Sequence, residues 1–106
     1  LYKSDLVTDK YAYVKVVEAG ATYQATALRF APTTIVTASG SGNYYFELVL
    51  GIPYTAHFFI DMNGNAGTMD FLPDSGDQYA SKNFTLEADL TTLDVADGDW
   101  QIFTGP

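Results

Sequence analysis

The chain contains no cysteine, and this absence removes several kinds of site at once. Thiol nucleophiles, zinc–thiolate centres and disulfide bridges all require cysteine. Histidine is almost as scarce, because His57 is the only one. No serine near His57 in the sequence forms a recognisable nucleophile motif. We therefore predict that the protein is not an enzyme, and we assign no catalytic residue.

Basic residues are also few, with 5 Lys and Arg against 13 Asp and Glu, and the formal net charge is −8. A chain of this charge repels nucleic acid and anionic membrane surfaces, so neither is an expected partner. No apolar run approaches the roughly 18 residues of a membrane-spanning helix, so we expect no membrane insertion. An excess of carboxylates does suit a divalent cation, because hard cations prefer oxygen ligands.

The composition is typical of a folded β domain, since hydrophobic residues make up 47% of the 106 residues and aromatic residues 15%. The length suits a single domain over residues 1–106. Short strand-like runs recur between turn signals, and they are Tyr11–Glu18, Thr22–Phe30, Thr34–Thr37, Tyr44–Leu50, Tyr54–Ile60, Asn83–Leu90 and Trp100–Thr104. This pattern predicts an all-β fold, a Greek-key β-sandwich of about seven strands. A helix is an alternative only over Leu86–Val95, where leucines have helical spacing.

The segment Leu48–Tyr54, with the sequence LVLGIPY, contains a detail typical of immunoglobulin-like sandwiches. Leu48 lies six residues before Tyr54, and Gly51 and Pro53 break the chain between them. This spacing resembles a tyrosine corner, in which a Tyr hydroxyl bonds back to the upstream backbone. The alternative interpretation is a buried Tyr that opens a strand.

The segment Asp61–Asp70, with the sequence DMNGNAGTMD, is the strongest candidate site, and it follows an apolar strand directly. Side chains that carry oxygen alternate at Asp61, Asn63 and Asn65, and glycines in the segment let the backbone curl around one cation. The site is therefore predicted to bind calcium. A plain turn is the alternative, because Asn63–Gly64 is a hairpin signal without any ion.

The segment is not an EF-hand, since Ala66 stands where that loop has glycine and Leu72 where it has glutamate. It resembles instead the calcium loops of extracellular bacterial β-sandwich modules. These are the B-type repeats of surface adhesins and transthyretin-like domains with a DxNGNG loop after a strand. The resemblance covers at most the stretch from Tyr44 to Asp70, and the Ala66–Gly67 step departs from the usual Asn-Gly ending.

The resemblance implies a ligand set for calcium and a transthyretin-like or immunoglobulin-like sandwich around it. Its metal ligands would be Asp61, Asn63, Asn65, a carbonyl near Gly67 and the carboxylate of Asp70. Asp74 and Asp77 would complete the shell, because calcium takes six to eight oxygens. The resemblance also implies a secreted or cell-surface location.

Aromatic residues offer two further candidate surfaces. Trp100 follows several acids and could stack on a sugar ring, although a core Trp that opens the last strand is the alternative. In the strand Tyr54–Ile60, alternation places Phe58 toward the core and Phe59 on the outer face. The aromatic residues expected on outer faces are Tyr11, Tyr13, Tyr45 and Phe59. They predict an aromatic binding face or a surface covered by another subunit.

Together these features predict a non-enzymatic extracellular or cell-surface module for structure or adhesion, stabilised by calcium. One alternative is a carbohydrate-binding module that uses Trp100 and surface tyrosines. The other is a subunit of an extracellular filament, in which residues 1–10 form a detached strand that pairs with a neighbouring sheet. Expected partners are therefore a second copy of the chain, a glycan or a protein at the cell surface.

Overall fold

The described residues form β-strands joined by turns and loops. A computed structural model describes residues 10–25, 27–36, 48–62, 75–85, 95 and 97–104, with the backbone alone over residues 29–36 and at residue 97. The elements are β1 (Lys10–Glu18), β2 (Arg29–Val36), β3 (Pro53–Ile60), β4 (Gln78–Thr85), the 3-10 turn η2 (Asp97–Asp99) and β5 (Gln101–Ile102). No α-helix occurs in these ranges, so the predicted all-β class is confirmed for them.

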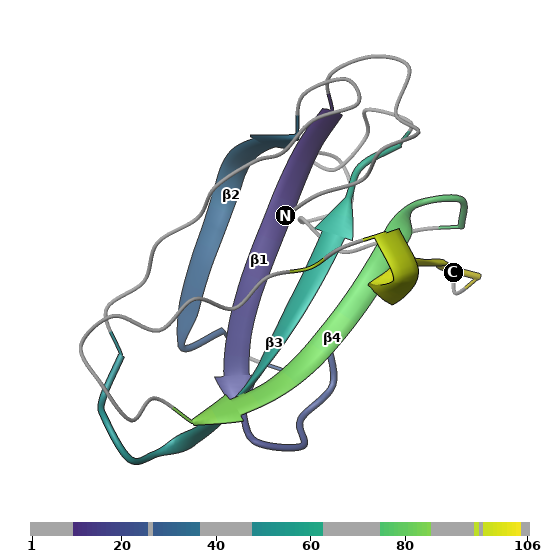
Figure 1. The fold of residues 1–106 in the computed structure, drawn as a ribbon. Helices are drawn as coiled ribbons and strands as arrows, with labels where there is room; N and C mark the ends of the chain where they lie inside the picture. The colour runs from purple at the N-terminus through teal and green to yellow at the C-terminus, as the bar shows by residue number, and fades with distance from the viewer. Residues whose placement is uncertain are drawn as a thin grey trace.

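The strands form one antiparallel sheet in the order β2-β1-β3-β4-β5. Figure 1 shows the four long strands side by side, with β4 running obliquely across the twisted sheet. The ladder between β1 and β3 runs from the pair Ala12–Ile60 to the pair Glu18–Tyr54. These two strands are therefore central, and β2 lies at one edge.

The two central strands agree closely with the sequence prediction. Each begins one residue earlier than expected, β1 at Lys10 and β3 at Pro53, and each ends where predicted. Both are rich in β-branched and aromatic residues, which fit a pleated surface.

The strand predicted over Thr22–Phe30 is wrong in position, because β2 begins only at Arg29. The described residues between β1 and β2 form turns and bends, with backbone hydrogen bonds from Ala21 N to Glu18 O and from Ala25 N to Thr22 O. Gly20 adopts a φ of 83°, in the left-handed region that glycine enters without strain. The chain reverses here, so that β2 can return antiparallel to β1.

β2 also includes most of the short strand predicted over Thr34–Thr37, since it continues through Pro32 to Val36. Proline has no N–H to donate to a ladder, and it is tolerated at edge strands and bulges. Both conditions hold at Pro32. β2 is an edge strand of the described sheet, and the register shifts between the pairs Ala12–Thr34 and Val14–Ala31.

The strand predicted over Asn83–Leu90 begins five residues earlier than expected, because β4 starts at Gln78. The register with β3 explains the earlier start, since Ile60 pairs with Gln78 across the hairpin. Residues 86–90 lie outside the described residues, and so do Tyr44 to Glu47 of another predicted strand. The described end of that strand, residues 48–50, is not β structure.

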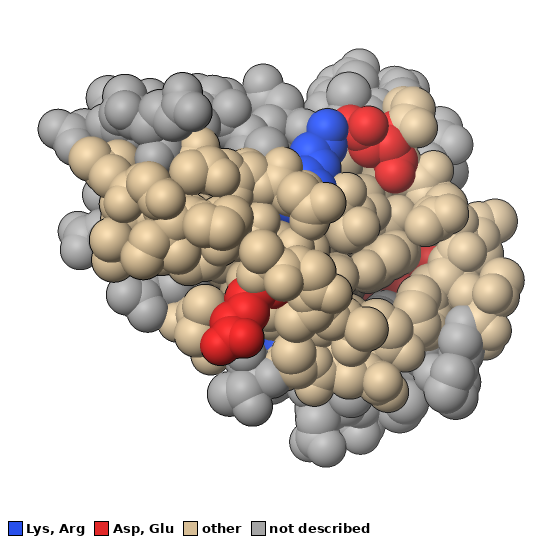
Figure 2. All heavy atoms as spheres, turned by 90° about the horizontal axis from the view of Figure 1, so that it is seen from below, with Lys and Arg blue, Asp and Glu red and all other residues tan. Residues whose placement is uncertain are grey.

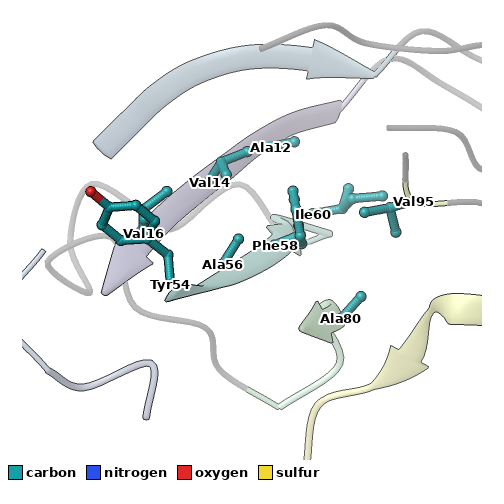
Figure 3. Close-up of a cluster of buried hydrophobic side chains, with 9 residues drawn as sticks. All are labelled: Ala12, Val14, Val16, Tyr54, Ala56, Phe58, Ile60, Ala80 and Val95. Carbon is teal, nitrogen blue, oxygen red and sulfur yellow. The ribbon is translucent and has the colours of Figure 1, made fainter. Parts of the chain in front are cut away.

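One face of the sheet carries the main hydrophobic core. Alternate residues of β1 and β3 point to this first face, together with Ala80 of β4 (Figure 3). Val95, which lies outside the strands, also belongs to the cluster. The buried members are Ala12, Val14, Val16, Tyr54, Ala56, Phe58, Ile60, Ala80 and Val95. The predicted core-facing position of Phe58 is therefore confirmed.

The opposite face of β1 and β3 is buried as well, which alternation alone did not predict. This second face carries Tyr13, Lys15 and Val17 from β1 and Thr55, His57 and Phe59 from β3, all of them buried. The ring centroids of Tyr13 and Phe59 lie 5.4 Å apart, and Tyr79 of β4 packs against the pair. Both central strands are thus covered on both sides.

The described surface carries few charged side chains in the view of Figure 2, where most described atoms are neutral. This fits the low content of charged residues, 17% of the chain. The exposed large apolar side chains are Tyr11, Leu28, Val49, Leu50, Ile52 and Ile102.

Tyr54 joins the start of β3 to the chain before it, as the tyrosine-corner prediction requires. The backbone N–H of Val49 donates to the Tyr54 hydroxyl at 3.2 Å. The Tyr54 ring is buried in the first-face cluster and lies 5.8 Å from the ring of Phe84. The bond to the upstream backbone is therefore confirmed, and the residue also opens a strand, as the alternative interpretation expected.

We predict that Tyr54→Phe lowers the free energy of unfolding by about 0.5–1.5 kcal/mol, because it removes one hydrogen bond and keeps the ring. Tyr11→Phe is the matched control, since Tyr11 is 55% exposed, and it should change stability by less than about 0.5 kcal/mol. Urea unfolding measures both. Equal effects of the two substitutions would contradict the role assigned to the Tyr54 hydroxyl.

Candidate functional site

The loop between β3 and β4 begins and ends with a buried acid. Asp61 directly follows β3 and is 4% exposed, and Asp77 directly precedes β4 and is 2% exposed. The last pair of the ladder is Ile60–Gln78, so Asp61 and Asp77 stand at the next opposed positions. Side chains alternate along a strand, so both belong to the second face, in line with Phe59 and Tyr79.

Hydrogen bonds tie this end of the hairpin to its neighbours. The Asp77 carboxylate accepts a bond of 3.0 Å from the backbone N–H of Met62, the residue after Asp61. The Asp61 N–H donates to Tyr11 O at 2.9 Å, and the Lys10 ammonium donates to Met62 O at 3.2 Å. The start of the loop is therefore held by both β1 and Asp77.

Gly76 makes the return into β4 possible. Its φ of 98° is in the left-handed region, and its N–H donates to Phe103 O at 2.9 Å. The Phe103 N–H in turn donates to Asp77 O at 2.7 Å. The backbone on both sides of the Asp77 side chain is thus held by Phe103, the residue after β5.

The phenol of Tyr13 lies within the electrostatic influence of both Asp61 and Asp77. Burial raises the pKa of its phenol above 10.0, and the negative charges of Asp61 and Asp77 raise it further, with a smaller effect of Tyr11. The phenol of Tyr13 is therefore neutral at physiological pH. Asp61 and Asp77 therefore both lie near the Tyr13 phenol, at one end of the second face.

The structure thus brings together Asp61 and Asp77 from the predicted ligand set. The other predicted ligands lie outside the described residues, and they are Asn63, Asn65, Gly67, Asp70 and Asp74. Within the described ranges, no three His, Cys, Asp or Glu side chains form one group that could hold a metal ion. The described residues therefore contain two carboxylates of the predicted ligand set, and these do not form a metal-binding group by themselves.

A second polar cluster surrounds His57, four residues before Asp61 on the same face. Its Nε2 lies 2.8 Å from Ala21 O, and its Nδ1 lies 2.5 Å from the Tyr79 hydroxyl. A carbonyl only accepts, so Nε2 carries the proton and donates to Ala21, and Nδ1 accepts from Tyr79. Both ring nitrogens are therefore engaged inside the protein, which gives His57 a structural role.

The environment of His57 disfavours its protonated form. Burial lowers the pKa of His57 below 6.5, and the positive charge of Lys15 lowers it further, although the bond to Ala21 O acts in the opposite direction. Lys15 pairs directly with His57 in the ladder and is itself buried, which lowers its own pKa. Its ammonium donates to Tyr23 O at 2.7 Å.

Sequence reasoning missed the partners of His57. The predicted strands do not include Tyr79, which lies in β4 and shares a strand face with Ser81 and Asn83. Neither the Tyr79 hydroxyl nor Ala21 O could be found as a partner without the tertiary structure, because they lie 22 and 36 positions from His57 in the chain.

The structure gives the environments of three aromatic residues that were candidates for a surface role, Tyr13, Phe59 and Trp100. Phe59 is only 1% exposed and Tyr13 is buried beside it, so the prediction that they form an outer aromatic face is wrong. The reason is that the second face is covered. Trp100 is half-buried against the first-face cluster, as its core interpretation expected.

Comparisons with protein-family models, curated proteins and solved structures find no match to this chain. No helix among the described residues is long and apolar enough to cross a membrane.

We predict that Phe59→Ala lowers the free energy of unfolding by about 3–5 kcal/mol, because it opens a cavity beside Tyr13. Ile102→Ala is the control on an exposed apolar residue, 65% exposed, and it should cost less than about 0.5 kcal/mol. Denaturant unfolding measures both. A small effect of Phe59→Ala on stability, together with a lower particle mass than that of the unmodified chain, would instead support an outer face that another subunit covers.

Proposed function

We propose that the protein is a non-enzymatic structural or adhesion module of the cell surface or extracellular space, stabilised by calcium bound in the Asp61–Asp77 loop. The observation that carries the proposal is the pair of buried carboxylates at opposed positions, Asp61 and Asp77. Like charges that are held close together repel one another, and a divalent cation bound between the two carboxylates would stabilise them.

The chemistry of the donors suits calcium. Calcium takes six to eight oxygens, and carboxylates are its usual charged ligands. Asp61 and Asp77 would supply two, and the loop sequence between them offers Asn63, Asn65 and Asp70. Met62 N–H already bonds one oxygen of Asp77, which orients this carboxylate at the base of the loop.

The wider proposal concerns the fold and the class of protein. We propose that the described sheet is one layer of a Greek-key sandwich of about seven strands, immunoglobulin-like or transthyretin-like. The hydrogen bond from Val49 to the Tyr54 hydroxyl supports the immunoglobulin-like form. The engagement of both His57 nitrogens within the fold supports a role other than catalysis.

We predict that calcium raises the melting temperature. An ion that binds only the folded state, at one hundred times its dissociation constant, adds about 2.7 kcal/mol of stability. For a domain of this size the shift is roughly 10 °C. Thermal melts in calcium and in chelator measure it, and identical melts would refute the calcium site.

Matched variants separate charge from hydrogen bonding. Asp77→Asn keeps an oxygen for Met62 N–H but removes the charge, so it should weaken or abolish the calcium shift. Asp61→Asn should do the same. Asp99→Asn is the control, because its partly exposed carboxylate pairs with Lys82 at 3.1 Å on another part of the sheet, and its calcium shift should be unchanged.

A second candidate is a filament subunit assembled by strand exchange, and the position of β2 favours it. Among the described strands, β2 has a neighbour on one side only, and an unpaired edge is a template for another strand. Lys10 already pairs with Val36 inside the sheet, so the exchanged segment would be residues 1–9 rather than 1–10.

We predict for this second candidate that the full chain forms oligomers at high concentration and that a chain lacking residues 1–9 stays monomeric. Light scattering of both chains, with and without calcium, measures the difference. Monomers in every case would exclude strand exchange and leave the calcium-stabilised module. Oligomers of both chains would exclude residues 1–9 as the exchanged strand.

A further inference from the structure

The loop between β1 and β2 is fastened to the second face by side chains of the central strands. Gly20 N–H donates to the Thr55 hydroxyl at 2.9 Å, and Ala21 O accepts from His57. Tyr23 O accepts from the Lys15 ammonium. Three successive points of the loop, residues 20, 21 and 23, are therefore bound to the sheet through polar side chains.

Aromatic rings pack around the same attachment. The ring of Tyr23 lies edge-on to Tyr79 and Phe103, at centroid distances of 6.1 and 5.2 Å. The His57 ring stacks on Tyr79 at 5.9 Å. The loop thus helps to cover the face on which His57 and Lys15 lie, and its removal would expose them to water.

The groups that face His57 include one cation and no described carboxylate in contact. They are Lys15 from β1 and Tyr79 with Ser81 from β4, and Tyr23 of the loop packs edge-on against Tyr79. The acids of this face, Asp61 and Asp77, lie at its far end beside Tyr13. At about 3.3 Å per residue, Asp61 is roughly 13 Å further along the strand.

Protonation of His57 would therefore place a second positive charge beside Lys15. Directly opposed residues have Cβ atoms about 4.5–5.5 Å apart, and like charges there are destabilising. A proton on Nδ1 would also make this nitrogen a donor, so it could no longer accept the hydrogen bond from the Tyr79 hydroxyl. Water could solvate both cations only if the loop moved away.

We propose that His57 and Lys15 form an acid-sensitive latch, in which protonation of His57 releases the loop of residues 20–23 from the second face while the sheet stays folded. The sign follows from linkage. Closing the loop lowers the pKa of His57 below 6.5. The closed state is therefore fully stabilised above pH 6.5, and this stability is lost as the pH falls from 6.5 to the pKa of His57 in the closed state.

The test uses the intact chain and its single histidine, whose ring signal gives one unambiguous NMR titration. The reporter is the Gly20 amide, which is bonded to Thr55 in the closed state. Hydrogen exchange at each pH, corrected for intrinsic rates, measures its protection. Between pH 6.5 and the titration midpoint of His57 in the intact chain, we expect the protection factor of the Gly20 amide to fall about tenfold per pH unit.

Two variants isolate the charge. His57→Gln can donate to Ala21 O and accept from Tyr79 but cannot become charged, so Gly20 protection should not change between pH 8 and 5. Lys15→Met should raise the His57 midpoint toward 6.5 and reduce the loss of protection. All titrations are run at saturating calcium and again in chelator, so that an effect of the Asp61–Asp77 loop is seen separately.

Three outcomes would overturn the latch. The first is a His57 titration in the intact chain without any change at Gly20. The second is the same pH dependence at Gly20 in His57→Gln. The third is a parallel loss of protection in β3, at Phe58 for example, which would mean that the whole sheet unfolds rather than the loop alone.

Discussion

The ladder between β1 and β3 is the contact on which the rest of the structure depends. It pairs seven residues of each strand, from Ala12–Ile60 to Glu18–Tyr54, and both strands are buried on both faces. The backbone N–H and C=O groups of such a strand must form hydrogen bonds with neighbouring strands, because water does not reach them. β2 and β4 do so on either side, and their registers are set by β1 and β3.

Burial of the second face has a chemical consequence, because its side chains are not all apolar. Lys15, Thr55 and His57 are buried there, and burying a polar group without a partner costs free energy. Each has a hydrogen-bond partner, and no buried side-chain nitrogen or oxygen in the described residues lacks one. The partners include carbonyls of the β1–β2 loop, so the polar side chains also decide where that loop lies.

The two ends of the second face differ in charge. Asp61 and Asp77 make one end negative, and the buried Lys15 makes the middle positive. The two proposals concern different ends of this face, a divalent cation at the acids and a proton at His57. The calcium proposal and the latch proposal depend on different side chains, so either can fail without the other.

The sequence by itself determined the all-β class, the two central strands, the core-facing position of Phe58 and the bond between Tyr54 and the upstream backbone. These features follow from alternation and turn signals, which act between near neighbours. It also singled out Asp61, which directly follows an apolar strand. Only the tertiary structure decided where β2 and β4 begin, the burial of Phe59, the hydrogen bond from Met62 to Asp77 and the contact of His57 with Tyr79. The physical reason is that period-two alternation separates the two faces of a strand but does not say whether the second face meets water. What covers that face depends on pairs far apart in the chain, and a register sets those pairs only when the strands meet.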